Sequence, residues 1–396
     1  MRDARSLTLA LAAMLAASFP PGAAAATRPA VRDFLRRAGF TLDQLAALDR
    51  GQAITRRLGA EVVAPNETAE FAAFGAVRVD APRELFAEAV RSIEGFRYEG
   101  MQRVTMIGNP PQPSDFAALS LPPEDVKDLR DCRPGACALK LAGPNLAELK
   151  ARIDWKARDH AEQVNRFARE QLLAAMRLYV GEGTAAFKPL EDKSSSISID
   201  QQLRELLGNT PELLAYYPEL HEYVLEYPRR PRLARSQELF YWSLNEFGLK
   251  PTLTVTHVVG YAPEGSEDVV VVWKQLYASH YFNGGLAVTT YARDPEGAYV
   301  VHLDRVRADG LGGMFGGVKR SKIAGAAEKT LRKFLEATGQ PPGAGAEAVR
   351  TDRNSLPSAD SRRRPEARRP AVRAVLRSGA HQPKEPGSCG SLAAVQ

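Results

Sequence analysis

The sequence predicts an α+β protein in which a curved antiparallel sheet is closed by a C-terminal helix. Two patterns lead to this fold class. Between residues 237 and 338, four or five strand-like runs follow one another, then a glycine-rich turn, and then one amphipathic helix. Between residues 144 and 232, apolar residues recur every three or four positions, which is typical of helices and predicts a helical insertion. A curved sheet wrapped around a terminal helix encloses space, so this fold indicates binding.

The chain before residue 144 alternates between helix and strand signals. Thr41 and Gln44 form a capping box at the start of a short helix that Gly51 ends. Pro82 stands in the first turn of a second helix, where proline is tolerated because its missing N–H would have no partner there. The elements predicted after the first helix are a strand at 71–79, a helix at 82–94, a strand at 97–107 and a short strand at 136–141.

The insertion predicts several helices. Residues 144–180 would span ~55 Å as one helix, and a break within them is the alternative. Two further helices are expected at 203–207 and 211–227. This stretch is rich in tyrosine, which either lines a pocket or packs ordinarily with its hydroxyls at the rim. The tyrosines are Tyr216, Tyr217, Tyr223 and Tyr227.

The strands after the insertion form a meander. Residues 251–261 alternate, so His257 shares one face with Leu253, Val255 and Val259. The remaining elements predicted here are a weak strand at 239–242, strands at 269–282, 286–292 and 299–306, a hairpin turn at 294–297, a glycine-rich connection at 310–317, and a final helix whose apolar stripe is Ile323, Ala327, Leu331, Phe334 and Leu335.

The N-terminus predicts export. Arg2 and Arg5 precede an apolar run of 14 residues, 6–19, which is short for a membrane span, and small residues before Thr27 suit cleavage. Residues 1–26 are therefore interpreted as a signal peptide, with an uncleaved anchor as the alternative. We expect a periplasmic or secreted protein.

Cys132 and Cys137 flank a Pro-Gly turn. In an oxidising compartment this spacing predicts a small hairpin disulfide, and a metal site is the competing interpretation. A loop this short would fix local shape more than global stability. Cys389 lies in the tail and is expected to be a free thiol.

Net charge argues against nucleic acid as a partner. The chain carries +6, but residues 340–396 hold ten Arg or Lys against five Asp or Glu, and residues 1–26 hold two Arg against one Asp. The remaining residues are neutral, whereas a nucleic-acid-binding fold carries its own basic patch. The composition of residues 340–396 predicts a disordered basic tail, which either contacts an anionic surface or is a solvated extension.

The order of strand, helix, several antiparallel strands and closing helix resembles the helix-grip fold of the START-like or SRPBCC-like superfamily. The parts are 71–79, 82–94, the meander 251–308 and the helix after residue 317. Residues 27–143 and 233–339 would form this domain, with 144–232 as its insertion or cap. The resemblance implies a deep cavity between sheet and terminal helix, usually for an apolar ligand. Three segments, THVVGY, WKQLYASHYF and GLGGMFGG, also resemble uncharacterised secreted bacterial proteins.

Four polar residues are candidate ligand anchors: His257, Lys274, Tyr277 and His280. His257 is either a hydrogen-bonded core histidine or a group that projects into the cavity. Lys274 could bind a carboxylate or lie on a solvated face. Strand alternation places Lys274 and His280 on one face and Tyr277 on the other, unless a bulge intervenes.

Three residues of the last strand are further candidates. His302 and Asp304 share a face, and a metal site there would require a third ligand from another strand. Arg305 lies on the opposite face, as an anion clamp or on a solvated sheet edge.

These residues lead to one functional expectation. The glycines at 310–317 lack phosphate-loop spacing, and neither Ser194–Ser196 nor Ser279 stands in a nucleophile elbow. We expect an exported, non-enzymatic module that binds an apolar or amphiphilic small molecule and needs no cofactor. The alternatives are an envelope interaction protein, or an enzyme that uses His257 or His280 as an acid–base group. The sequence leaves the oligomeric state open.

Overall fold

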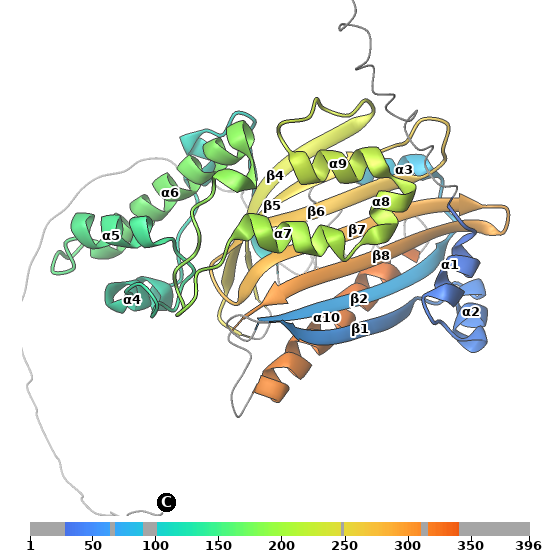
Figure 1. The fold of residues 1–396 in the computed structure, drawn as a ribbon, viewed down its shortest axis with the longest axis horizontal. Helices are drawn as coiled ribbons and strands as arrows, with labels where there is room; N and C mark the ends of the chain where they lie inside the picture. The colour runs from blue at the N-terminus through green and yellow to red at the C-terminus, as the bar shows by residue number, and fades with distance from the viewer. Residues whose placement is uncertain (1–27, 64–67, 90–100, 247–248, 310–315, 340–396) are drawn as a thin grey trace, which may run out of the picture. The chain divides into compact units, whose positions relative to one another are not determined.

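A computed structural model describes residues 28–63, 68–89, 101–246, 249–309 and 316–339 (Figure 1). Its centre is an eight-stranded antiparallel sheet with the strand order β1-β2-β8-β7-β6-β5-β4-β3. The α+β class and the antiparallel sheet are therefore confirmed. The strands are β1 Ile54–Val63, β2 Thr68–Val79, β3 Met101–Ile107, β4 Ser236–Asn245, β5 Thr252–Tyr261, β6 Val269–Ala278, β7 Phe282–Asp294 and β8 Gly297–Ala308.

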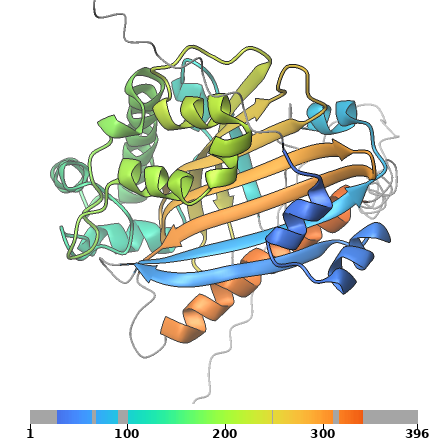
Figure 2. The ribbon, with the colours of Figure 1, turned by 45° about the vertical axis from the view of Figure 1, so that its right-hand side comes forward.

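Helices lie on both faces of the sheet (Figures 1 and 2). One face packs against α10, and this is called the α10 face; the other, called the insertion face, carries α6 to α9. The helices are α1 Val31–Arg37, α2 Leu42–Asp49, α3 Arg83–Ala89, α4 Pro123–Asp131, α5 Gly143–Arg152, α6 His160–Glu182, α7 Ile199–Gly208, α8 Pro211–Tyr216, α9 Pro218–Glu226 and α10 Gly316–Gly339, with short 3-10 turns η2 Pro113–Phe116 and η3 Thr184–Ala186.

Strands from before and after the insertion belong to one sheet. β2 pairs along its length with β8, so that Phe74 lies opposite Leu303. The predicted capping box is present, because the Thr41 side chain accepts from the Gln44 N–H and Gln44 accepts from the Thr41 N–H. No described helix is long and apolar enough to cross a membrane.

Several element boundaries differ from those expected. Residues 144–180 break into α5 and α6, because Ile153 takes an extended conformation at the end of α5. The predicted strand at 136–141 is a bridge and loop that follow the disulfide turn. The predicted long strand 269–282 ends at Ala278, and Tyr281 in the turn that follows has φ +58°. β1 was not predicted.

Some expectations fall outside the described residues. These are the signal peptide at 1–26, residues 90–94 and 97–100 of two predicted elements, most of the glycine-rich connection, and the tail with Cys389.

Two apolar cores flank the sheet. On the insertion face, α4 to α9 bury a large cluster against β4, β5 and β6. On the α10 face, Leu331 and Leu335 pack against β2, β7 and β8. Each of these fully buried leucines contributes about 1.5–3 kcal/mol to folding.

Candidate functional site

A cavity of about 270 Å³ lies between α10 and the sheet, and it is called the α10 cavity. Small residues on both surfaces leave this space open: Gly285 and Ala287 on β7 face Ala326 and Ala327 on α10. A Cβ at Gly285 would lie 3.3 Å from the Cβ of Gln275, so a side chain there would fill the floor. The apolar wall comprises Met101, Trp273, Phe282, Ile323, Leu331 and Phe334.

The floor of the α10 cavity holds a carboxyl and an imidazole, both from β8. Asp304 is half-buried, and its partial removal from water raises its pKa to about 6. None of the hydrogen bonds or ion pairs found among the described residues involves Asp304. His302 lies two residues earlier on the same face, with its Nδ1 2.7 Å from the Thr289 hydroxyl. Burial lowers the pKa of His302 to about 4, so its ring is neutral at pH 7.

Other polar groups extend the floor towards β4. The Nε2 of Gln275 is buried and has no hydrogen-bond partner. Asn245 donates to Thr254 at 2.8 Å and to Ser243 at 3.0 Å, so these groups are already paired. The α10 cavity thus combines an apolar wall with a floor on which the Asp304 carboxyl has no partner among the described residues. This composition suits a small amphiphile.

His257 and Lys274 lie on the insertion face, opposite the α10 cavity, and are directly paired across β5 and β6. This corrects the expected placement of these anchors under the C-terminal helix. The Tyr179 hydroxyl lies 2.7 Å from the Nδ1 of His257, and burial lowers the pKa of His257 well below its usual value. Lys274 donates to the Val224 carbonyl at 3.0 Å, and burial lowers its pKa to about 8.

A β-bulge explains why Tyr277 also faces the insertion. Val255 lies opposite Tyr277 whereas Thr256 lies opposite Gln275, so Leu276 is an extra residue in β6. The alternation therefore shifts by one position, and Tyr277 leaves the face of Gln275. Its hydroxyl donates to the Lys140 carbonyl at 3.0 Å.

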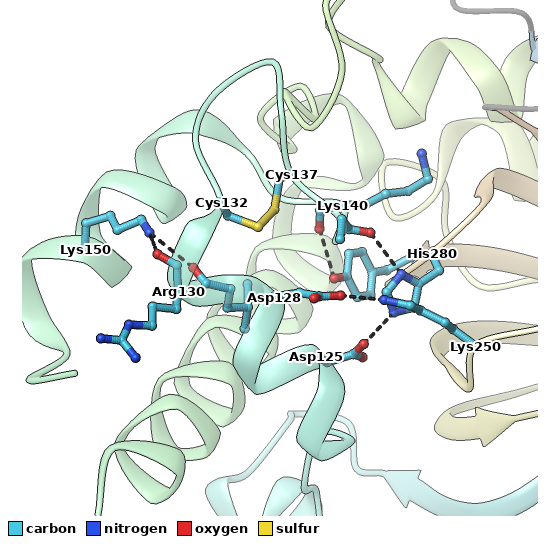
Figure 3. The surroundings of a disulfide bond; sticks show 12 residues. Asp125, Asp128, Arg130, Cys132, Cys137, Lys140, Lys150, Lys250 and His280 are labelled. Atoms are coloured by element: carbon cyan, nitrogen blue, oxygen red, sulfur yellow. Dashed lines mark hydrogen bonds and ion pairs between the residues drawn. A yellow bond between two sulfur atoms is a disulfide. The ribbon is translucent and has the colours of Figure 1, made fainter. Parts of the chain in front are cut away.

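His280 is buried against α4 (Figure 3). Its Nε2 lies 2.9 Å from Asp125, and its Nδ1 lies 3.0 Å from the Ala138 carbonyl. Since both ring nitrogens lie within hydrogen-bond distance of oxygen atoms of the protein, neither is free to bind a ligand. It lies outside the α10 cavity.

The predicted disulfide between Cys132 and Cys137 is confirmed, directly after α4 (Figure 3). The hairpin docks on the chain around Asp192, whose carbonyl accepts from the Cys137 N–H at 3.0 Å. Three residues later Lys140 is buried and binds Asp309 at 2.6 Å. Burial raises the pKa of the Asp192 carboxyl, although Lys140 at 3.6 Å opposes this shift.

Arg305 lies opposite His302 and Asp304, as expected from alternation. Its Nη1 donates to Glu70 at 2.9 Å, and Glu70 also accepts from Arg307 at 3.1 Å. Arg307 binds Glu205 of α7 as well. The anion that Arg305 contacts is therefore a carboxylate of the same chain. Its Nε is buried without a partner, beside a groove of about 370 Å³ between α1 and α8.

Sequence reasoning placed His302 and Asp304 on one face and expected a cavity under the closing helix, but it did not assign these two residues to that cavity. The overlooked signal is the run of small residues in α10, Ala324 to Ala327, and the glycine pair in β7. No three His, Cys, Asp or Glu side chains of the described residues lie close enough together to hold a metal ion.

Comparison with known proteins gives no family. No protein-family model matches the chain, and no curated protein has a matching sequence. The functional argument therefore rests on the geometry of the site.

Proposed function

We propose that this protein is an exported, non-enzymatic module that binds an amphiphilic small molecule in the α10 cavity. The observation that carries the proposal is the carboxyl of Asp304, which has no partner in the described part of the chain and faces an apolar wall across a cavity of about 270 Å³. Buried polar groups normally have partners. A half-buried carboxyl that opens to a largely apolar cavity is therefore suited to a ligand group that donates a hydrogen bond.

The ligand has two ends in this proposal. Its polar end carries an N–H or O–H that donates to Asp304. Its apolar body packs against Trp273, Leu331 and Phe334, where each buried methylene contributes about 0.8 kcal/mol.

Binding without catalysis fits the histidines better than acid–base chemistry does. His257 and His280 have different hydrogen-bond partners, and neither lines the α10 cavity. His302 does line it, but burial lowers its pKa to about 4, so its ring is a weak base and has no acidic proton to donate at pH 7. Export is supported by the disulfide, because thiols remain reduced in the cytosol of most organisms.

Native mass spectrometry of the full chain, purified without denaturation, tests this proposal. We expect an excess mass that is lost on denaturation and that identifies the amphiphile. Ala287→Phe should abolish this mass by filling the floor, and Asp304→Asn should lower its occupancy severalfold. Ala117→Phe and Asp128→Asn are the matched controls, since neither residue lines the α10 cavity.

Two results would contradict the proposal. One is an unloaded protein whose thermal stability does not respond to amphiphiles of any charge, which would favour an envelope interaction protein. The other is a bound mass that Ala287→Phe leaves unchanged, which would place the ligand elsewhere.

A further inference from the structure

A second cavity, of about 420 Å³, lies on the insertion face and is called the insertion cavity. It is bounded by α5, α6, β5 and β6, and none of its lining residues lines the α10 cavity. Its walls are almost entirely apolar, with Leu149, Phe167, Leu172 and Leu276 among them. An unfilled apolar space of this kind costs folding free energy, so an apolar occupant stabilises the protein.

Two alanines give the insertion cavity an elongated wall. Ala168 and Ala175 both line it from α6, and they are seven residues, or about two helical turns, apart. Residues seven apart lie on the same stripe of a helix, so the two alanines mark a lining stripe ~10 Å long, called the α6 furrow, which runs between the larger Gln171 and Leu172. A furrow fits a linear chain better than a compact ring system.

Of the charged residues described at the insertion cavity, one is available to pair with a ligand. Its charged lining residues among those described are Lys140 and Lys188. Lys140 is neutralised by Asp309 and is 2 % exposed, so it is committed inside the protein. Lys188 is exposed, and no hydrogen bond or ion pair found among the described residues involves its ammonium group.

The uncharged polar groups at the wall are already paired. The Asn145 amide donates to Gln171 at 2.7 Å, and Gln171 donates to Glu148 at 3.1 Å. Tyr277 donates to the Lys140 carbonyl. Glu148 also binds Arg152, so the carboxylate at this edge is offset by a cation.

We propose that the insertion cavity binds a single-chain carboxylate amphiphile of the fatty-acid type. The methylene chain lies along the α6 furrow between α5 and the sheet. The carboxylate pairs with Lys188 in solvent. This site is distinct from the α10 cavity, so the protein holds two ligands of different chemistry on opposite faces of one sheet.

Titration of the delipidated full chain with straight-chain saturated carboxylates of increasing length tests this inference. Affinity should rise roughly tenfold for every two added methylenes and then level off when the chain fills the cavity. Ala175→Phe should abolish the binding, and the milder Ala175→Leu should shorten the chain length at which the affinity levels off. Circular dichroism of both variants checks that α6 is intact.

The headgroup is tested separately. Lys188→Gln should weaken carboxylate binding about two- to fivefold, the effect expected for an exposed ion pair. It should leave the matching uncharged alcohol unchanged. Lys156→Gln, at an exposed lysine of the insertion that does not line the cavity, is the control.

Three outcomes would overturn the inference: an affinity that is independent of chain length, unchanged binding by a folded Ala175→Phe variant, or equal loss in Lys188→Gln and Lys156→Gln. Ala287→Phe separates the two sites, because it blocks the α10 cavity alone. If Ala287→Phe abolishes carboxylate binding while Ala175→Phe does not, the carboxylates occupy the α10 cavity instead.

Discussion

The two faces of the sheet differ in the partners of their buried and half-buried ionisable groups. On the insertion face, His257 meets Tyr179 through its Nδ1 and Lys274 meets the Val224 carbonyl, while His257 Nε2 and Glu238 Oε1 are buried with no hydrogen-bond partner among the described residues. On the α10 face, the half-buried carboxyl of Asp304 lines a cavity and has no hydrogen-bond or ion-pair partner in the described ranges. Buried polar groups with partners stabilise a fold, whereas an enclosed group without one is a candidate for ligand recognition. Asp304 is distinguished from these insertion-face atoms because it lacks a partner in the part of the chain that the structure describes and also lines the α10 cavity.

Breaking a pair on the insertion face should have the largest effect. His280→Ala leaves Asp125 buried without its partner, and we expect the free energy of unfolding to fall by about 3–5 kcal/mol. Urea unfolding at pH 7 measures this loss. Lys250→Ala is the control, because its ion pair with Asp128 is exposed to solvent and should contribute about 0–1 kcal/mol. Equal losses in the two variants would show that His280 is not structural.

Removing the unpaired carboxyl on the α10 face should have the opposite sign. The pKa of Asp304 rises from 3.8 in the unfolded chain to about 6 in the folded protein, because burial disfavours its charge. The charged carboxyl thus destabilises the folded state above pH 6, and this cost disappears as the pH falls from about 6 to about 4. Asp304→Asn should therefore raise the free energy of unfolding at pH 7 by about 1–2 kcal/mol, after allowance for solvent reaching the cavity.

Urea unfolding of ligand-free protein at two pH values checks this. The gain from Asp304→Asn should be present at pH 7 and absent near pH 4. A loss of stability at pH 7 would mean that the carboxyl has a stabilising partner, and it would weaken the proposed role of Asp304 in binding.

His302 should give the smallest effect and a pH dependence of the reverse sign. Burial lowers its pKa from 6.5 to about 4, so below pH 6.5 the unfolded chain takes up a proton that the folded state does not. Stability is therefore lost as the pH falls from about 6.5 to about 4. His302→Gln should make the protein about 1 kcal/mol more stable than the parent near pH 4.5, relative to their difference at pH 8. Thermal unfolding of the parent and of His302→Gln across this pH range measures the difference. Parallel profiles of stability against pH would show that His302 does not titrate in this way.

Local patterns predicted much of the chain. Thr41 and Gln44 gave a correct helix start because capping involves neighbouring residues only. The shared face of His302 and Asp304 followed from strand alternation, and both residues line the α10 cavity. The Cys132–Cys137 disulfide followed from spacing around a turn. In each case the contacts lie within a few residues along the chain.

Other expectations required contacts that the sequence does not encode locally. The extra residue at Leu276 turns Tyr277 away from Gln275, and a bulge is visible only from the pairing of two strands. Tyr179 contacts His257 from 78 residues away. These contacts decide which buried polar side chains are satisfied.

The sequence by itself determined the α+β class, the antiparallel meander, the closing helix and, where no bulge intervenes, which side chains share a face of a strand, because these depend on periodicity. Only the tertiary structure decided which helix covers which face, and hence that His257 and Lys274 lie beneath the insertion while Asp304 lies beneath α10. Alternation divides the side chains of a strand between two faces, but it does not say which helices cover each face. That choice depends on packing between segments far apart in the chain.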